Sequence, residues 1–101
     1  MTDAKICRRA LISGKVQGMG YRYHTRQQAL RLGVKGWVRN LEEGRVEAWV
    51  EGDRNAVEAI VQWFHQGPAA AIVDAVALNN EPLQQFAQFE IRRGPSSEAA
   101  G

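Results

Sequence analysis

The sequence predicts an α+β domain in which two helices pack on one face of an antiparallel sheet of four to five strands. Segments with helical periodicity alternate along the 101-residue chain with segments in which apolar and polar residues alternate, and no repeat or linker divides them. With 45% hydrophobic residues, the chain is long enough for one core and too short for two. We expect one domain over residues 1–93 and a disordered polar tail over residues 94–101.

The first strand is predicted to end near Ser13, because apolar and polar residues alternate from Arg8 onward. A glycine-rich segment follows at residues 14–22 (Gly-Lys-Val-Gln-Gly-Met-Gly-Tyr-Arg). It leads into a helix over residues 21–32, a stretch without glycine or proline, and Gly33 supplies the C-terminal stop of this helix. One stripe of the helix is predicted to face the core: Tyr21, Thr25, Ala29 and Leu32.

Two strands are predicted next, over residues 34–41 and 45–51. They are joined as a hairpin by Glu-Glu-Gly, in which Gly44 can adopt the left-handed conformation. The core face of the second strand is marked by small and branched residues, Val46, Ala48 and Val50. Trp49 should therefore point to the opposite face.

A second helix is predicted between Asp53, which suits an N-cap, and the helix-ending pair at residues 67–68. Its apolar residues follow an i, i+3, i+4, i+7 stripe: Val57, Ile60, Val61 and Phe64. Two further strands are predicted over residues 72–78 and 86–92. The resulting βαββαβ order, with a short fifth strand, is the split βαβ sandwich of ferredoxin-like domains.

This topology brings two distant residues together. Its first crossover joins two strands that run the same way with another strand between them, so both strands end at the same end of the sheet. The first strand ends at the glycine-rich segment, and the second ends near Asn40. We therefore expect Asn40 to lie beside Arg22, although eighteen positions separate them.

The glycine-rich segment suits the binding of an anion. Glycines allow positive φ angles that turn successive N–H groups toward one point, and a helix start adds unpaired donors and partial positive charge. Arg22 opposes the helix dipole unless an anion lies between them. A nucleotide P-loop is excluded by the position of Lys15, and a dinucleotide fingerprint by Tyr23 in place of a third glycine. An ordinary strand-to-helix turn with a solvated arginine is the alternative.

The composition limits partners and location. The net charge of +2 is spread over both halves of the chain, which favours a small anion over nucleic acid. The single cysteine, Cys7, is expected to be buried, and it has no nearby cysteine or histidine pair for zinc, so neither a metal nor a cofactor is expected. The N-terminus lacks a secretory apolar region, and no run of 18 apolar residues occurs. These features predict a soluble cytoplasmic protein without membrane contact, and a monomer.

The chemistry of the two converging residues is restricted. The guanidinium of Arg22 can bind two phosphate oxygens, and the amide of Asn40 can orient a water molecule. Neither group is a general base near neutral pH, and the segment contains no Ser, Cys, His or carboxylate nucleophile. The pair therefore suits a substrate with a good leaving group, such as a mixed carboxylic-phosphoric anhydride.

The motifs closely resemble those of acylphosphatases, over residues 6–92. The resemblance rests on these residues: 14–22, Thr25, 36–40 (Gly-Trp-Val-Arg-Asn), Gly44 and 89–91 (Phe-Glu-Ile). It implies that Arg22 and loop amides bind the phosphate and that Asn40 holds the attacking water in line. The implied amides are those of Gln17, Gly18, Met19, Gly20 and Tyr21. It further implies hydrolysis of an acyl phosphate to a carboxylate and inorganic phosphate, with no metal and no covalent intermediate. Met19 and Tyr21 replace the Val and Phe that the family often has.

Two other functions stay open on the sequence. Ferredoxin-like sheets with exposed aromatic residues bind single-stranded RNA, and residues 35–38 (Lys-Gly-Trp-Val) resemble the start of an RNP1 motif. Trp37 and Trp49 would then stack on bases, whereas they are otherwise expected to cover a sheet face. A noncatalytic ligand-binding or interaction module is the second alternative. Lys15 either adds positive potential to the loop or is solvated, and His24 is expected on the surface, turned away from the loop.

Overall fold

The computed structural model describes residues 4–93, so the predicted disordered tail lies outside the described residues. Five strands and two helices follow in the predicted order. Their bounds are β1 (Lys5–Lys15), α1 (Tyr21–Leu32), β2 (Lys35–Asn40), β3 (Val46–Asp53), α2 (Arg54–Gln66), β4 (Ile72–Glu81) and β5 (Phe89–Ile91). Both helices begin and end where their stripes and caps predict. Neither described helix is long and apolar enough to cross a membrane.

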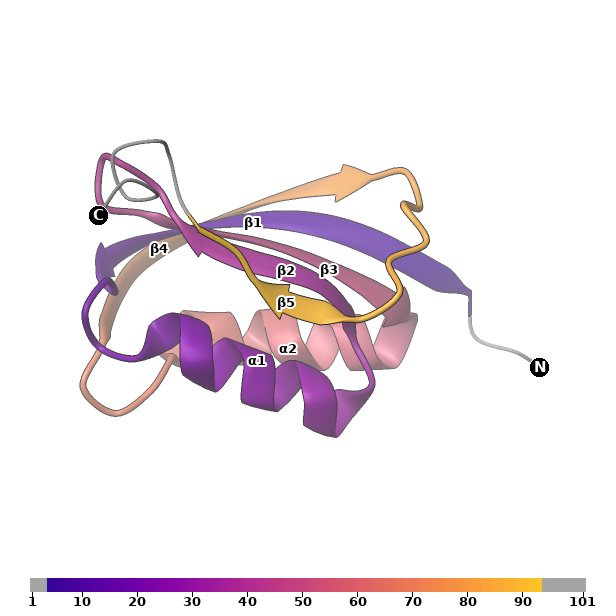
Figure 1. Cartoon of the computed structure of the whole chain (residues 1–101), viewed down its shortest axis with the longest axis horizontal. Helices are drawn as coiled ribbons and strands as arrows, with labels where there is room; N and C mark the ends of the chain where they lie inside the picture. The colour runs from indigo at the N-terminus through magenta and orange to yellow at the C-terminus, as the bar shows by residue number, and fades with distance from the viewer. Residues whose placement is uncertain (1–3, 94–101) are drawn as a thin grey trace.

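The strands form one sheet in the order β4-β1-β3-β2-β5 (Figure 1). β1 and β2 both pair antiparallel with β3, so they run the same way and end at the same end of the sheet, as predicted. β4 is antiparallel to β1, whereas β5 is parallel to β2. The ferredoxin-like fold is confirmed, but the five-stranded sheet is mixed and not antiparallel throughout.

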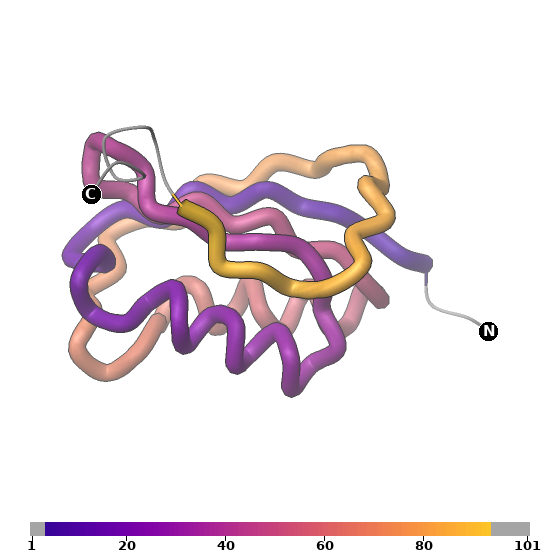
Figure 2. Tube along the Cα trace, in the orientation of Figure 1, coloured from indigo at the N-terminus to yellow at the C-terminus, as the bar shows by residue number. Residues whose placement is uncertain are grey.

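Both helices lie on one face of the sheet, and the core fills the space between them and the strands (Figures 1 and 2). Alternate residues of β3, namely Val46, Ala48 and Val50, belong to this core together with the apolar stripe of α2. Complete burial of a Val, Ile or Phe side chain stabilises a fold by about 1.5–3 kcal/mol. The fully buried side chains include those of Ile12, Val38, Val46, Val50, Ile60 and Phe64.

The start of α1 is held against the end of α2 by Tyr21. Its ring is 1% exposed and packs on Trp63 and Phe64, and its hydroxyl donates a hydrogen bond to the Phe64 carbonyl at 2.8 Å. Burial raises the pKa of this phenol. Gly67 makes room for the ring, because a Cβ at that position would lie 2.8 Å from the Cε2 atom of Tyr21. These contacts set the position of the next residue, Arg22.

Gly14 does not belong to the loop, contrary to the prediction from the sequence. β1 continues to Lys15, and Gly14 lies at a register shift in the pairing of β1 with β4. Its φ is 127°, and a Cβ would lie 2.2 Å from the carbonyl oxygen of Ile72. The close approach of β4 therefore requires this glycine.

β5 begins later than the predicted strand at residues 86–92. The N–H of Phe86 donates to the Glu51 carboxylate at 2.9 Å, and the N–H groups of Gln84 and Gln85 donate to the same buried carboxylate. This side chain replaces a strand partner for the three donors, so regular pairing with β2 starts only at Phe89.

The face of the sheet that the helices leave uncovered carries the tryptophans. Trp37 and Trp49 stack with ring centroids 6.1 Å apart, and the guanidinium carbons of Arg39 and Arg92 lie 5.3 and 4.8 Å from the Trp37 ring centroid. Trp37 is only 9% exposed. The tryptophans thus cover the sheet, and these contacts disfavour base stacking on Trp37. Cys7 is also buried on this side, where burial first, and Glu51 and Glu81 next, raise the pKa of its thiol to about 11.

Candidate active site

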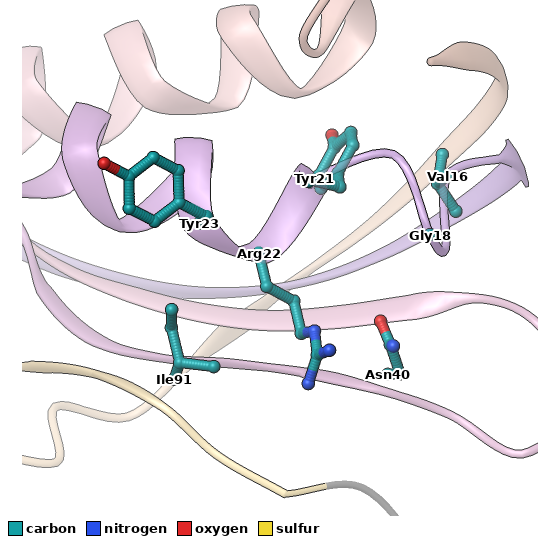
Figure 3. Close-up of a pocket in the computed structure, with 8 residues that line it drawn as sticks. Val16, Gly18, Tyr21, Arg22, Tyr23, Asn40 and Ile91 are labelled. Atoms are coloured by element: carbon teal, nitrogen blue, oxygen red, sulfur yellow. The ribbon is translucent and has the colours of Figure 1, made fainter. Parts of the chain in front are cut away.

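One cavity of 320 Å³ lies among the loop after β1, the start of α1, the end of β2 and β5 (Figure 3). It brings together five of the predicted site residues, namely Gly18, Gly20, Tyr21, Arg22 and Asn40. Three further residues that were not predicted as site residues from the sequence also line it: Val16, Tyr23 and Ile91. The convergence predicted from topology is therefore present in the fold.

The loop of residues 16–20 has the glycine conformations that an anion site requires. Gly18 and Gly20 have φ angles of 78° and 74°, in the left-handed region. Gly20 is the N-cap of α1, and within the described chain no side chain caps this helix and no acidic residue stands in its first turn. An anion near these N–H groups would also meet the positive end of the helix dipole.

Arg22 and Asn40 approach the cavity from different elements. The Arg22 side chain extends from the first turn of α1 toward the sheet, and its guanidinium lies between Asn40 and Ile91 (Figure 3). Asn40 is the last residue of β2 and is 9% exposed. The guanidinium can grip phosphate oxygens, and the neighbouring amide can both donate and accept a hydrogen bond.

Gln17 and Met19 are not among the described residues that line the cavity. The Gln17 side chain crosses to the β2–β3 turn, where its Nε2 donates to the carbonyl oxygens of Leu41 at 2.7 Å and Arg45 at 2.9 Å. The sequence indicated only a main-chain role for Gln17. No local pattern signals this tie, because its partners are 24 and 28 positions away.

A model of the family described as acylphosphatase matches residues 8–91. The acylphosphatase of Acaryochloris marina is 57% identical over 88 residues, covering 87% of this chain and 95% of that protein. The acylphosphatase of Pseudomonas aeruginosa is 47% identical over 90 residues, covering 89% of this chain and 99% of that protein. The chain belongs to the acylphosphatase family. Its predicted enzyme class, a hydrolase acting on acid anhydrides, is confirmed by these relatives.

The acylphosphatase fold is also confirmed by solved structures. The structure of an acylphosphatase from Coxiella burnetii superimposes with a TM-score of 0.84 at 33% identity, covering 87% of this chain and 93% of that chain. The acylphosphatase from Bacillus subtilis gives the same TM-score of 0.84 at 31% identity, covering 86% of this chain and 98% of that chain. The mixed sheet with two helices is thus the architecture of this family.

The cavity of this acylphosphatase-family chain offers cationic and amide groups. Its described lining contains no carboxylate, histidine, cysteine or serine. The described lining has two phenol hydroxyls: that of Tyr21 donates to the Phe64 carbonyl on the core side, and that of Tyr23 accepts a hydrogen bond from Gln27 at 2.9 Å. Within residues 4–93, no three His, Cys, Asp or Glu side chains form a group that could hold a metal ion. The arrangement can bind an anion and orient a neutral molecule beside it.

Two basic residues near the loop lie outside the described lining of the cavity. Lys15 is exposed at the end of β1. His24 is on the surface, as predicted, but its ring is not turned away from the loop, since Nδ1 donates to the Gly20 carbonyl at 2.8 Å. The His24 ring therefore contacts the main chain of the loop and does not line the cavity as described.

Proposed function

We propose that this chain hydrolyses acyl phosphates to a carboxylate and inorganic phosphate by direct attack of water. Arg22 and the main-chain N–H groups of residues 17–21 hold the phosphate, and Asn40 orients the water. The water oxygen forms a bond to phosphorus, the bond from phosphorus to the acyl oxygen breaks, and the acyl group leaves as a carboxylate. The single observation that supports the proposal is the cavity that Arg22, Asn40 and the loop glycines share.

Binding of the phosphate follows from its charge. An anion at the start of a helix gains about 0.3–1 kcal/mol, and up to ~2 kcal/mol where it is partly buried. The planar fork of Arg22 adds charge-assisted hydrogen bonds to two oxygens. These donors are fixed before the reaction begins, so they stabilise the negative charge of the transition state without reorganisation.

Attack by water needs orientation more than a base in this reaction. The leaving carboxylate is a weak base, and phosphoryl transfer is accelerated largely by positioning and charge stabilisation. The Asn40 amide can accept a hydrogen bond from the water and donate one to the phosphate, which aims the water oxygen at phosphorus. No metal and no covalent intermediate take part in this scheme.

The test is release of carboxylate and phosphate from benzoyl phosphate in the presence of a chelator. Asn40→Ala should lose at least about 10²-fold in turnover while inorganic phosphate still binds, because one preorganised polar group is lost. Arg22→Ala should lose both turnover and phosphate binding. Undiminished turnover in either variant would contradict its assigned role. If the chelator abolished wild-type activity, the metal-free mechanism would be wrong.

The same measurements address the remaining alternatives. Phosphate binding without any turnover of benzoyl phosphate would support a noncatalytic ligand-binding module. Salt-sensitive binding of single-stranded RNA at micromolar protein would support the RNA-binding alternative. The monomeric state is a prediction that sedimentation checks, and the cytoplasmic location is a prediction as well.

A further inference from the structure

A second cavity adjoins the candidate active site. It has a volume of 340 Å³, and its described lining is Arg22, Ile91, Arg92 and Arg93. Arg22 and Ile91 line both cavities, so the two spaces meet at these side chains. The route from the proposed phosphate position therefore leads past Ile91 to two more arginine residues.

The reaction geometry directs the acyl group toward this side. The attacking and leaving oxygens of a phosphoryl transfer are roughly in line, so the acyl group leaves on the side opposite the water at Asn40. Figure 3 shows Asn40, Val16 and Gly18 on one side of the Arg22 side chain, and Ile91 and Tyr23 on the other. The acyl group would thus lie against Ile91 and Tyr23.

These two side chains offer apolar contact beside the phosphate. Tyr23 is 55% exposed and Ile91 is 41% exposed, and both line the first cavity. An apolar acyl body that covers them would remove hydrophobic surface from water, which favours binding. Beyond this contact lie the charged groups of the second cavity.

Arg92 lines the second cavity at the edge of the sheet, and its guanidinium packs on the Trp37 ring, on the face of the sheet that the helices leave uncovered. Its guanidinium carbon is 4.8 Å from the centroid of the Trp37 ring, and its Nε donates to Glu90 at 3.3 Å. The side chains of Arg92 and Glu90 are 48% and 44% exposed, so solvent screens this pair and Glu90 offsets only part of the positive charge. The ring contact restrains the guanidinium and leaves N–H donors for an anion.

We propose that the second cavity is an acyl subsite that favours acyl phosphates with a second negatively charged group. That group would lie beyond the apolar part of the acyl chain, within reach of Arg92 and Arg93. This inference rests on the proposed function of the adjoining cavity. It adds a preference for the substrate class: an acyl phosphate whose acyl group carries a negative charge over one of equal size whose acyl group is uncharged.

The test compares 4-carboxybenzoyl phosphate with 4-carbamoylbenzoyl phosphate, which have the same shape and differ in charge. Each kcat/KM is divided by the rate of uncatalysed hydrolysis of that compound. At an ionic strength of about 20 mM, where exposed charges are weakly screened, we expect the carboxylate compound to be favoured about tenfold. High salt should reduce the preference.

Single-charge variants localise the effect. Arg92→Gln and Arg93→Gln should each lower the preference, and Glu90→Gln should raise it. The matched control is Arg31→Gln, since Arg31 is turned about 180° from Arg22 around α1 and donates to Gln28 at 2.7 Å. This control should keep the full preference.

Three outcomes would overturn the inference. One is an equal normalised kcat/KM of the wild type for the two compounds. Another is an unchanged preference in both Arg92→Gln and Arg93→Gln. In either case, hydrolysis of both compounds would leave the proposed function standing. Failure to hydrolyse either compound would overturn the proposed function and the subsite with it.

Discussion

The side-chain amide of Gln17 donates a hydrogen bond to the main-chain carbonyl of Leu41, the residue that follows Asn40. The same nitrogen donates a second hydrogen bond to the main-chain carbonyl of Arg45. The Leu41 N–H donates to this carbonyl as well, at 2.8 Å, within the β2–β3 turn. One side chain of the anion-binding loop thus holds the hairpin that carries the proposed water-orienting residue. We therefore expect these hydrogen bonds to set the relative position of the two halves of the site.

Replacing Gln17 should therefore affect the rate more than the stability of the fold. Gln17→Met keeps the length of the side chain and removes both hydrogen bonds. We expect kcat for benzoyl phosphate to fall about tenfold, because a small misplacement of a positioned group is costly in rate. Circular dichroism should show an unchanged fold.

Two comparisons separate positioning from a general loss of stability. Gln62→Met, on the exposed face of α2, should keep the wild-type kcat. The Gln17→Met and Asn40→Ala effects should combine to less than their product, since both act on the orientation of one water. An unchanged kcat in Gln17→Met would show that the tie has no part in positioning.

Tyr21→Phe should destabilise the fold without changing the chemistry. The substitution leaves the Phe64 carbonyl without its 2.8 Å hydrogen bond in a buried position, at a cost of about 1 kcal/mol. For a domain of this size, that cost lowers Tm by roughly 4–8 °C. Differential scanning calorimetry measures the shift, with Tyr23→Phe as an exposed control. An unaltered Tm would mean that the Tyr21 bond adds nothing to stability.

Glu47 should make the stability of the domain sensitive to acid. This carboxylate is 3% exposed and accepts hydrogen bonds from Arg9 at 2.6 Å, Arg39 at 2.8 Å and Trp49 at 3.2 Å. Burial raises the pKa of Glu47, but the three donors outweigh it and hold the pKa below its usual value. The unfolded chain therefore takes up this proton more readily than the folded chain.

The stability of the fold should therefore decrease as the pH falls. Glu47 contributes its full stabilisation above the ordinary carboxyl pKa, and the contribution is lost as the pH falls through the lowered pKa of the folded state. Urea unfolding at a series of acidic pH values should show this decline in the wild type. Glu47→Gln should be less stable at neutral pH and show a flatter acid slope, whereas the exposed Asp74→Asn should behave as the wild type does. If stability fell with acid equally steeply in Glu47→Gln and the wild type, the ion contacts of Glu47 with Arg9 and Arg39 would not cause the acid sensitivity.

Gly14→Ala should destabilise the sheet by more than Gly44→Ala does. Both glycines have positive φ, at 127° and 105°, but only the Gly14 Cβ would meet backbone, 2.2 Å from the Ile72 oxygen. Strain of φ alone costs roughly 1–3 kcal/mol. Urea unfolding of the two variants isolates the additional clash at Gly14. Similar losses in both would indicate that β4 moves aside at little cost.

Much of this protein is determined by local features of its sequence. The bounds of α1 and α2 follow from their apolar stripes and from Gly33 and Gly67, because helix ends depend on neighbouring residues. Gly18 and Gly20 adopt the positive φ that the loop composition predicts. The meeting of Arg22 and Asn40 was predictable as well, because chain topology alone sends β1 and β2 to the same end of the sheet.

Only the tertiary structure decides the contacts made across large sequence separations. It places Ile91 at the site through the parallel pairing of β5 with β2, and it turns the Gln17 amide to the hairpin. It assigns Gly14 to a strand bulge, and it makes Glu51 replace a strand partner before Phe89. These features depend on which carbonyls, carboxylates and Cβ positions meet when the sheet assembles. Sequence periodicity reports which face of an element is buried, but it does not report register or distant hydrogen-bond partners.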